Sequence, residues 1–472
     1  MNKLKMKSLV ICLLVIFNGG MLVAQELHNS DTIPGIVKSL VNNTSILSKL
    51  KFSGIIQAQW QKADTIGSLG KFSGGNFTGY DNRYLLRRGR FKAEYNDEFS
   101  RYVIQIDVTQ SGVAIKDAYA EFTDPWLKTF SLTGGVFNRP FGYEIGYSSG
   151  SLESPERSRI IQTLFPGEED LGAQLAIQAP STSPLNFIKL QGGLFTGNGL
   201  NPETDNYKDF IGQVILKKKL SDALTISGGA SYYSGGIAAV NSAGNFGKTS
   251  YAYLYDNISN GAYTKDSVKG GAKIKREYIG VDLQIGLHTI IGSTILRGEY
   301  ITGTQPGTAS INYSPTNDQP TPFAATTTTV TTYDLVQDSL GKYVKVPIKT
   351  STVTTKPAHT DYYLRPFSGG YLTLIQSLGK SKHSVVLKYE WYDPNTKLNA
   401  EQVKTIGDVK FTTIGIGWIY NWNSHLKLTA NYEIVKNEKT STPLTTSGIN
   451  GTNNYSQDLK DNVFTLRVQY RF

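Results

Sequence analysis

The sequence predicts an all-β protein, a transmembrane antiparallel β-barrel of about 16 strands with short periplasmic turns and long external loops. Three observations carry this prediction. From Lys51 onward, polar and apolar residues alternate in segments of about ten residues or more, the period of a strand whose two faces see different surroundings. The connections between these segments alternate between short and long. No run of about 18 apolar residues follows that could form a membrane-spanning helix.

Residues 1–24 have the pattern of a secretory signal peptide. Three lysines precede an apolar stretch, and small residues follow up to Ala24. Because the apolar stretch of about nine residues is too short to cross a bilayer, cleavage after Ala24 is favoured over a membrane anchor. The only cysteine, Cys12, lies in this segment, so the exported chain is expected to have no disulfide.

Residues 25–50 are predicted to form a periplasmic N-terminal segment. Apolar residues from Ile33 to Leu47 recur at helical spacing, and Asp31 and Pro34 are residues that often begin a helix. A short amphipathic helix and a leader without regular structure both fit this pattern.

The barrel is predicted to occupy residues 51–472. Its expected strands are 51–62, 83–95, 99–110, 113–123, 128–138, 170–179, 187–196, 208–219, 223–234, 275–287, 291–302, 369–378, 383–393, 409–421, 425–437 and 460–472. The last is the clearest, since apolar residues from Phe464 to Phe472 alternate strictly with polar ones. A terminal aromatic residue in such a strand resembles the assembly signal of outer-membrane proteins.

The connections separate into two kinds. Short ones, such as 96–98 and 220–222, alternate with connections that are often long, at 63–82, 139–169, 235–274, 303–368, 394–408 and 438–459. Short turns at one end and longer loops at the other are typical of membrane barrels, and a soluble sandwich has no reason to sort its connections in this way. The Thr-rich connection 303–368 is expected to be a low-complexity surface loop, with room for a hairpin of its own.

A basic cluster lies in the expected strand 83–95. Arg88, Arg90 and Lys92 share one parity, and residues two apart on a strand lie about 6.6–6.8 Å apart. The other parity is mostly apolar, so these three residues are expected to form a cationic ladder on the lumen wall, with Arg87 near a rim or redirected by Gly89. Such a ladder attracts anions, and guanidinium groups suit phosphate or carboxylate. Because general porins also carry basic clusters, a nonselective porin is the alternative.

The connection 139–169 is expected to be the third external loop. Its length of about 30 residues is unusual for a connection and sufficient to fold into the lumen. It holds Arg139, Arg157 and Arg159 together with five glutamates that include Glu169. Mixed charge suits a constriction element that pairs with the wall, while a surface loop with solvated charges is the alternative.

Five motifs occur in a fixed order: RRGRFKAEY, KDAYAEF, GGVFNRPFG, SPERS and LFPGEEDLGAQ. Together they resemble the phosphate-selective porin O/P family over most of residues 51–200. The resemblance implies a sixteen-stranded homotrimeric channel with an arginine ladder that guides phosphate. It assigns Arg87, Arg88 and Arg90 to the ladder, and Lys116 and Asp117 to a constriction or a relay.

The chain departs from that family at Glu169. This acid precedes Asp-Leu-Gly where the family often has an arginine, which puts strict phosphate selectivity in doubt. The abundance of tyrosine, with 28 residues, also indicates a divergent member.

These observations predict an outer-membrane porin for passive diffusion of small solutes, with anions such as phosphate preferred. A barrel that binds surface ligands through its long loops is a further alternative. An enzyme is not expected, because none of the five histidines lies mid-strand beside an obvious serine and no HExxH, P-loop or CxxC pattern occurs. No cofactor or metal site is indicated. The net charge of +10 is not gathered into a basic block interleaved with aromatics, so no nucleic-acid partner is expected.

Overall fold

The structure is a computed structural model. It describes residues 49–68, 77, 79–203, 205–239, 251–269, 271–309, 326–337, 341–355, 362–448 and 451–472. The expected signal peptide at 1–24 and the possible helix at 33–47 lie outside the described residues. The chain divides into residues 1–50 and a compact unit from Lys51 to Phe472.

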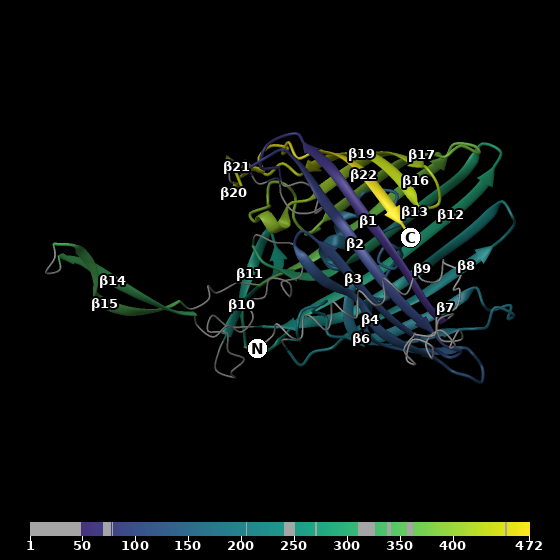
Figure 1. Cartoon of the computed structure of the whole chain (residues 1–472), viewed down its shortest axis with the longest axis horizontal. Helices are drawn as coiled ribbons and strands as arrows, with labels where there is room; N and C mark the ends of the chain where they lie inside the picture. The colour runs from purple at the N-terminus through teal and green to yellow at the C-terminus, as the bar shows by residue number, and fades with distance from the viewer. Residues whose placement is uncertain are drawn as a thin grey trace, which may run out of the picture. The chain divides into compact units, whose positions relative to one another are not determined.

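The compact unit is a closed antiparallel β-barrel of 16 strands (Figure 1). Its strands, in order around the ring, are β1 (Leu50–Ala63), β2 (Asn82–Asn96), β3 (Ser100–Thr109), β4 (Gly112–Thr123), β5 (Phe130–Asn138), β6 (Glu169–Gln178), β7 (Ile188–Phe195), β8 (Asp209–Lys219), β9 (Leu224–Ala238), β12 (Lys273–Thr289), β13 (Gly292–Gly307), β16 (Tyr362–Ser377), β17 (His383–Asp393), β18 (Phe411–Asn421), β19 (Leu426–Asn437) and β22 (Val463–Arg471). Pairing of β22 with β1, from Ile55↔Arg471 to Ala63↔Val463, closes the ring. All sixteen predicted strands correspond to barrel strands, so the predicted fold class is confirmed.

Three hairpins lie within long connections. They are β10 (Tyr251–Ser259) with β11 (Ala262–Lys269), β14 (Thr326–Gln337) with β15 (Tyr343–Thr355), and β20 (Thr445–Gly448) with β21 (Gly451–Asn454). The first joins the barrel sheet through a short parallel pairing of β10 with β16. We call the end of the barrel from which these hairpins arise the long-loop end, and the opposite end the short-turn end.

The predicted limits of the 303–368 connection were wrong. Residues 303–307 continue β13 and residues 362–368 begin β16, and the two stretches pair with each other from Gly303↔Phe367 to Gly307↔Tyr363. The longer strands are favoured because they bury Tyr362 and Phe367, which the turn-rich composition nearby concealed.

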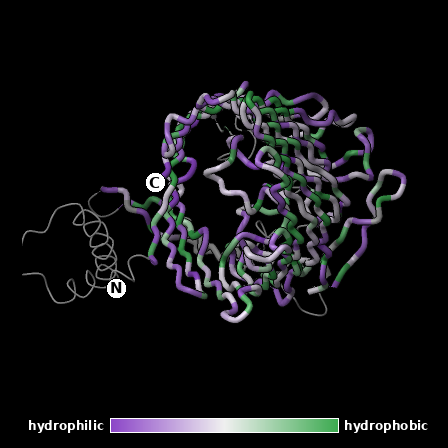
Figure 2. The backbone as a smooth tube through the Cα atoms, turned by 90° about the vertical axis from the view of Figure 1, so that its right-hand side faces the viewer, coloured by the Kyte–Doolittle hydropathy of each residue, from purple (hydrophilic) through white to green (hydrophobic). Residues whose placement is uncertain are grey.

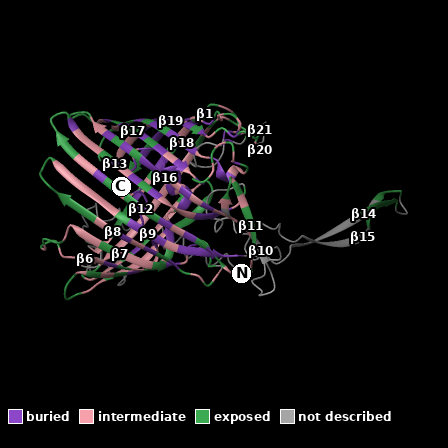
Figure 3. Ribbon diagram, turned by 180° about the vertical axis from the view of Figure 1, so that it is seen from behind, coloured by how far each residue is buried: buried purple, intermediate pink, exposed green. Residues whose placement is uncertain are grey.

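Side chains alternate between the lumen and the outer surface. On β22, Thr465, Arg467 and Gln469 are buried inside the barrel, while Leu466 and Val468 are 44% and 49% exposed on the outside. Polar residues therefore lie inward and apolar residues outward, the reverse of a soluble sheet and the arrangement that a barrel presents to lipid. Figure 3 marks the buried positions on the strands in purple. Among the described residues, no helix is long and apolar enough to cross a membrane.

The connection between β5 and β6, which we call the inner loop (residues 139–168), lies inside the ring and includes helix α4 (Arg159–Leu164). Figure 2, viewed from the short-turn end, shows chain crossing the interior of the ring. The inner loop and the lumen wall together form one apolar core: Phe137, Phe141, Ile145, Ile160, Ile161, Leu164, Phe165, Phe195, Ile211, Tyr233, Tyr278, Ile301, Phe367 and Tyr392. Because burial of large apolar side chains is strongly favourable, this core fixes the inner loop against the wall formed by β7 to β17.

Candidate functional site

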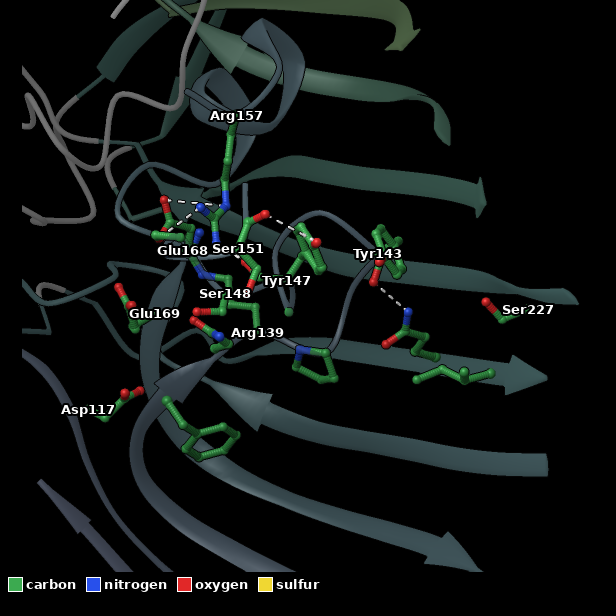
Figure 4. A pocket seen from close by; sticks show the side chains of 18 of the residues that line it. Asp117, Arg139, Tyr143, Tyr147, Ser148, Ser151, Arg157, Glu168, Glu169 and Ser227 are labelled. Carbon is green, nitrogen blue, oxygen red and sulfur yellow. Dashed lines mark hydrogen bonds and ion pairs between the residues drawn. The ribbon is translucent and has the colours of Figure 1, made fainter. Parts of the chain in front are cut away.

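A cavity of about 980 Å³ lies inside the barrel. Its lining extends from the inner loop to side chains near the short-turn end, such as Lys217, His288 and Arg471, and comes mainly from β1 to β9, β12 and β13. Figure 4 shows part of this lining, with Asp117, Glu168 and Glu169 near one another. The lining includes nine basic and five acidic residues, an excess of four positive charges.

Two of the predicted ladder residues contact the inner loop instead of the cavity. Arg87 and Arg88 donate to the Glu156 carboxylate at 2.7 and 3.0 Å, and Arg467 of β22 donates to it at 2.9 Å. Glu156 and Arg88 are almost completely buried, and neither Arg87 nor Arg88 lines the cavity. Burial alone would raise the pKa of the Glu156 carboxyl, but the three guanidinium groups outweigh this and hold the pKa well below its usual range.

Consecutive residues Arg87 and Arg88 both reach one carboxylate at a place where β2 extends past the end of β3. The β2–β3 register begins at Arg90↔Asp107, and β3 and β4 are joined by the two-residue turn 110–111. Arg87 therefore lies beyond the part of β2 that pairs with β3, on a stretch whose strand partner is β1.

The other two ladder residues do line the cavity. Arg90 is paired with Asp107 at 3.1 Å and also donates to Ser149 of the inner loop. Lys92 is paired with Glu94 at 2.9 Å. Their charges are thus balanced locally by carboxylates of the wall, which weakens the field that they project into the lumen.

Lys116 and Asp117 are neighbours in sequence yet both face inward. The β3–β4 register passes from Gln105↔Asp117 to Ile106↔Ile115, so a β-bulge at Lys116 reverses the alternation. Lys116 is buried and pairs with Glu169, and Glu168 is 3.8 Å away. Asp117 lines the cavity and has no hydrogen-bond partner among the described residues.

The three predicted loop arginines have different surroundings. Arg139 pairs with Asp170 at 3.2 Å, and Arg157 lies 3.7 Å from Glu168; both line the cavity. Arg159 lies over the ring of Phe411 at 4.2 Å and does not line the cavity. The structure therefore groups Lys116, Arg157 and the two glutamates at one place, while Arg159 is separate from them.

Other loop contacts were not predicted. Arg297 of β13 pairs with Glu153 at 2.7 Å, and Lys388 of β17 pairs with Glu144 at 3.1 Å. Their inward parity could be read from the strands, but their partners depend on the path of the inner loop. With Glu156 paired to β2 and β22, Glu144 to β17 and Glu153 to β13, ion pairs connect the inner loop to several strands of the wall.

Three lumenal cations differ from the rest. Among the described residues, Lys189, Lys217 and Arg471 line the cavity and form no ion pair with a carboxylate. In the same part of the chain, no cluster of three or more metal-ligating side chains could hold a metal ion.

The fold and cavity define the class: a closed, 16-stranded β-barrel with a polar lumen partly filled by its own loop. No protein family model matches the chain, and no curated protein sequence matches it. Among solved structures, similar ones include an anion-selective porin from Comamonas acidovorans (11% identity, TM-score 0.48, covering 90% of this chain and 99% of that one) and OprB from Pseudomonas putida (9%, 0.48, 91% and 96%). The outer membrane channel DcaP of Acinetobacter baumannii is similar at 11% identity and a TM-score of 0.45, with 90% and 97% covered. The strand count and closure rest on the pairing described above.

Proposed function

We propose that the protein is an outer-membrane porin, a passive diffusion channel whose lumen the inner loop narrows. The observation that carries this proposal is the inverted alternation of the barrel, apolar outward and charged inward, around a polar cavity. Exposed aromatic residues near the short-turn end, including Trp126 and Trp422 at 86% and 56%, suit a membrane interface. An open lumen of this kind supports transport in preference to catalysis.

A moderate anion preference follows from the cavity charge. The lining has an excess of four positive charges, and Lys189, Lys217 and Arg471 supply the cations that no carboxylate neutralises within the described residues. Rings of such cations favour anion entry. Phosphate selectivity through Arg87, Arg88, Arg90 and Lys92 has weaker support, because each of these residues already has a carboxylate partner. A homotrimer is proposed from the family resemblance.

The test is the zero-current potential of the purified mature protein in a planar bilayer under a KCl gradient, repeated with millimolar phosphate. Chloride preference is expected, with at most weak block by phosphate. Equal permeation of both ions would make the protein a general-diffusion porin. Strong block of the current by phosphate would support the anion-binding ladder expected on β2. Absence of conductance would overturn the channel proposal and favour surface binding. Cross-linking in detergent would report the number of subunits.

A further inference from the structure

The part of the cavity wall formed by β3 to β6 carries carboxylate, amide and aromatic side chains that the anion proposal does not use. β4 presents Asp117, Tyr119 and Glu121 to the lumen at two-residue spacing, and all three line the cavity. On the neighbouring strands, Gln105 and Arg101 pair in register with Asp117 and Glu121, and Thr133 pairs with both Glu121 and Gln174. We call Gln105, Asp117, Tyr119, Glu121 and Gln174 the β4 platform.

The polar groups of the β4 platform are largely available. Gln105, Asp117 and Gln174 have no side-chain hydrogen-bond partner among the described residues, and Glu121 accepts only a 3.4 Å contact from Thr133. This differs from Gln191 in the same cavity, whose amide donates to Gln213 at 2.8 Å. The side chains of the β4 platform therefore reach the cavity with free donors and acceptors.

Tyr119 supplies an aromatic surface between these groups. Gly135 lies opposite it in the register and carries no side chain, and its φ of 128° together with the close Tyr119 backbone excludes other residues. The ring meets Phe137 edge-on at 5.9 Å, and the Arg101 guanidinium lies at 5.8 Å. A ring flanked on both sides by carboxylate and amide groups is thus placed on the lumen wall.

Resting on the proposed channel function, we propose that the β4 platform is a binding site for neutral carbohydrates that pass through the lumen. Amides both donate to and accept from sugar hydroxyls, carboxylates accept from adjacent hydroxyl pairs, and the apolar face of a sugar packs on an aromatic ring. A phosphate site would lack Asp117 and Glu121, because carboxylates repel anions, and a cation site would not share a cavity with a positive excess. A cavity of about 980 Å³ accommodates one or a few sugar rings.

The test uses maltose and maltotriose as probes on the full-length mature protein. Calorimetric titration in detergent measures binding, and the fall of single-channel conductance with sugar concentration measures block. Wild type is expected to show both. Tyr119→Leu, Asp117→Leu and Gln174→Leu are each expected to weaken binding by about tenfold, the effect of losing one hydrogen bond or ring contact.

Gln191→Leu is the matched control, since it makes the same substitution in the same cavity at an amide that is already bonded; it is expected to keep sugar affinity within about twofold. Tyr119→Phe keeps the ring and should also retain binding, which separates loss of the site from loss of the fold. A conducting wild type that shows neither heat nor block with either sugar overturns the carbohydrate site while leaving the channel intact. An equal loss of sugar affinity in Gln191→Leu and Gln174→Leu would also contradict the carbohydrate site. If the protein binds sugar but conducts no ions, the carbohydrate site stands and the porin proposal is refuted.

Discussion

Arg88 of β2 and Glu156 of the inner loop form a buried ion pair of 3.0 Å, although 68 residues separate them in the chain. Both side chains are at most 3% exposed, and the charge of Glu156 is shared with Arg87 and Arg467. The residues that the sequence suggested as anion ligands therefore hold a segment of the same chain. This relationship connects the position of the inner loop with the stability of the barrel and with what can enter the lumen.

Glu156→Gln is expected to release the inner loop from the β1–β2–β22 wall. Removing one partner leaves buried guanidinium groups uncompensated, a loss of about 3–5 kcal/mol in the free energy of unfolding. Conductance should rise, since the released inner loop narrows the lumen less. Bilayer recordings and urea unfolding in detergent would measure both effects.

A matched control is Glu203→Gln, because Glu203 pairs with Lys208 at the surface, where the two side chains are 35% and 45% exposed. That change should alter stability by less than about 1 kcal/mol. Similar losses in the two variants would show that the buried cluster does not hold the inner loop.

The path of the inner loop at Gly142 provides a second prediction. Gly142 has φ of 62°, and a Cβ built there would overlap the Glu299 carboxylate, which accepts the backbone N–H groups of Tyr143 and Glu144. Gly142→Ala should displace this part of the inner loop, lowering stability by about 1–3 kcal/mol beyond the backbone strain and changing the conductance.

Gly167→Ala is its control. Gly167 also has a left-handed φ, of 80°, but nothing lies within 4 Å of its Cβ position. Gly167→Ala should lower the free energy of unfolding by about 1–2 kcal/mol, from backbone strain alone, and leave the conductance unchanged. If both variants unfold at the same urea concentration and conduct equally, close packing at Glu299 does not position the inner loop.

The strands could be predicted from the sequence because each is a local pattern. Leu466, Val468 and Tyr470 must face one environment and Arg467 and Gln469 another, whatever the rest of the chain does. The β-bulge at Lys116 could not be predicted in this way, since it adds one residue to one strand and is visible only in the register with β3. It places Lys116 beside Glu169 and Asp117 in the cavity.

The partners of the lumenal cations could not be predicted either. Alternation identified Arg88 and Arg90 as inward-facing, but it says nothing about which loop carboxylate lies opposite. The inner loop takes its position from long-range packing, such as Phe165 against Tyr278 at 5.7 Å, which has no signature at short sequence distance.

Asp461 provides a prediction with a defined pH window. It lies just before β22 and is 2% exposed, and one of its carboxylate oxygens has no hydrogen-bond partner among the described residues. Burial raises the pKa of Asp461 to about 6, although Arg159 lowers it in part. An acid whose folded pKa exceeds its unfolded value of about 3.9 disfavours the folded state increasingly as pH rises between those values, and the effect is absent below them.

Asp461→Asn should therefore stabilise the barrel at pH 7.5 by about 2–3 kcal/mol and have no such effect near pH 4, as measured by urea unfolding in detergent at both pH values. Asp222→Asn, at a fully exposed residue, is the control and should not change the pH dependence. A variant that matches wild type at pH 7.5 would show that Asp461 is not held in an unfavourable ionised state.

The last prediction concerns which cations select ions. Lys189 lines the cavity without a carboxylate partner, whereas Arg88 is buried against Glu156 and does not line it. Lys189→Gln and Arg88→Gln each remove one positive charge, but only the first removes it from the solute path. Because the field of a charge falls with distance and screening, Lys189→Gln should lower the chloride preference, and Lys189→Gln with Lys217→Gln should lower it further. Arg88→Gln should chiefly reduce stability, since Arg87 and Arg467 continue to neutralise Glu156. Zero-current potentials of the three variants under one KCl gradient would test this prediction. A larger loss of chloride preference in Arg88→Gln than in the lysine variants would show that the basic cluster of β2, and not Lys189 and Lys217, selects ions.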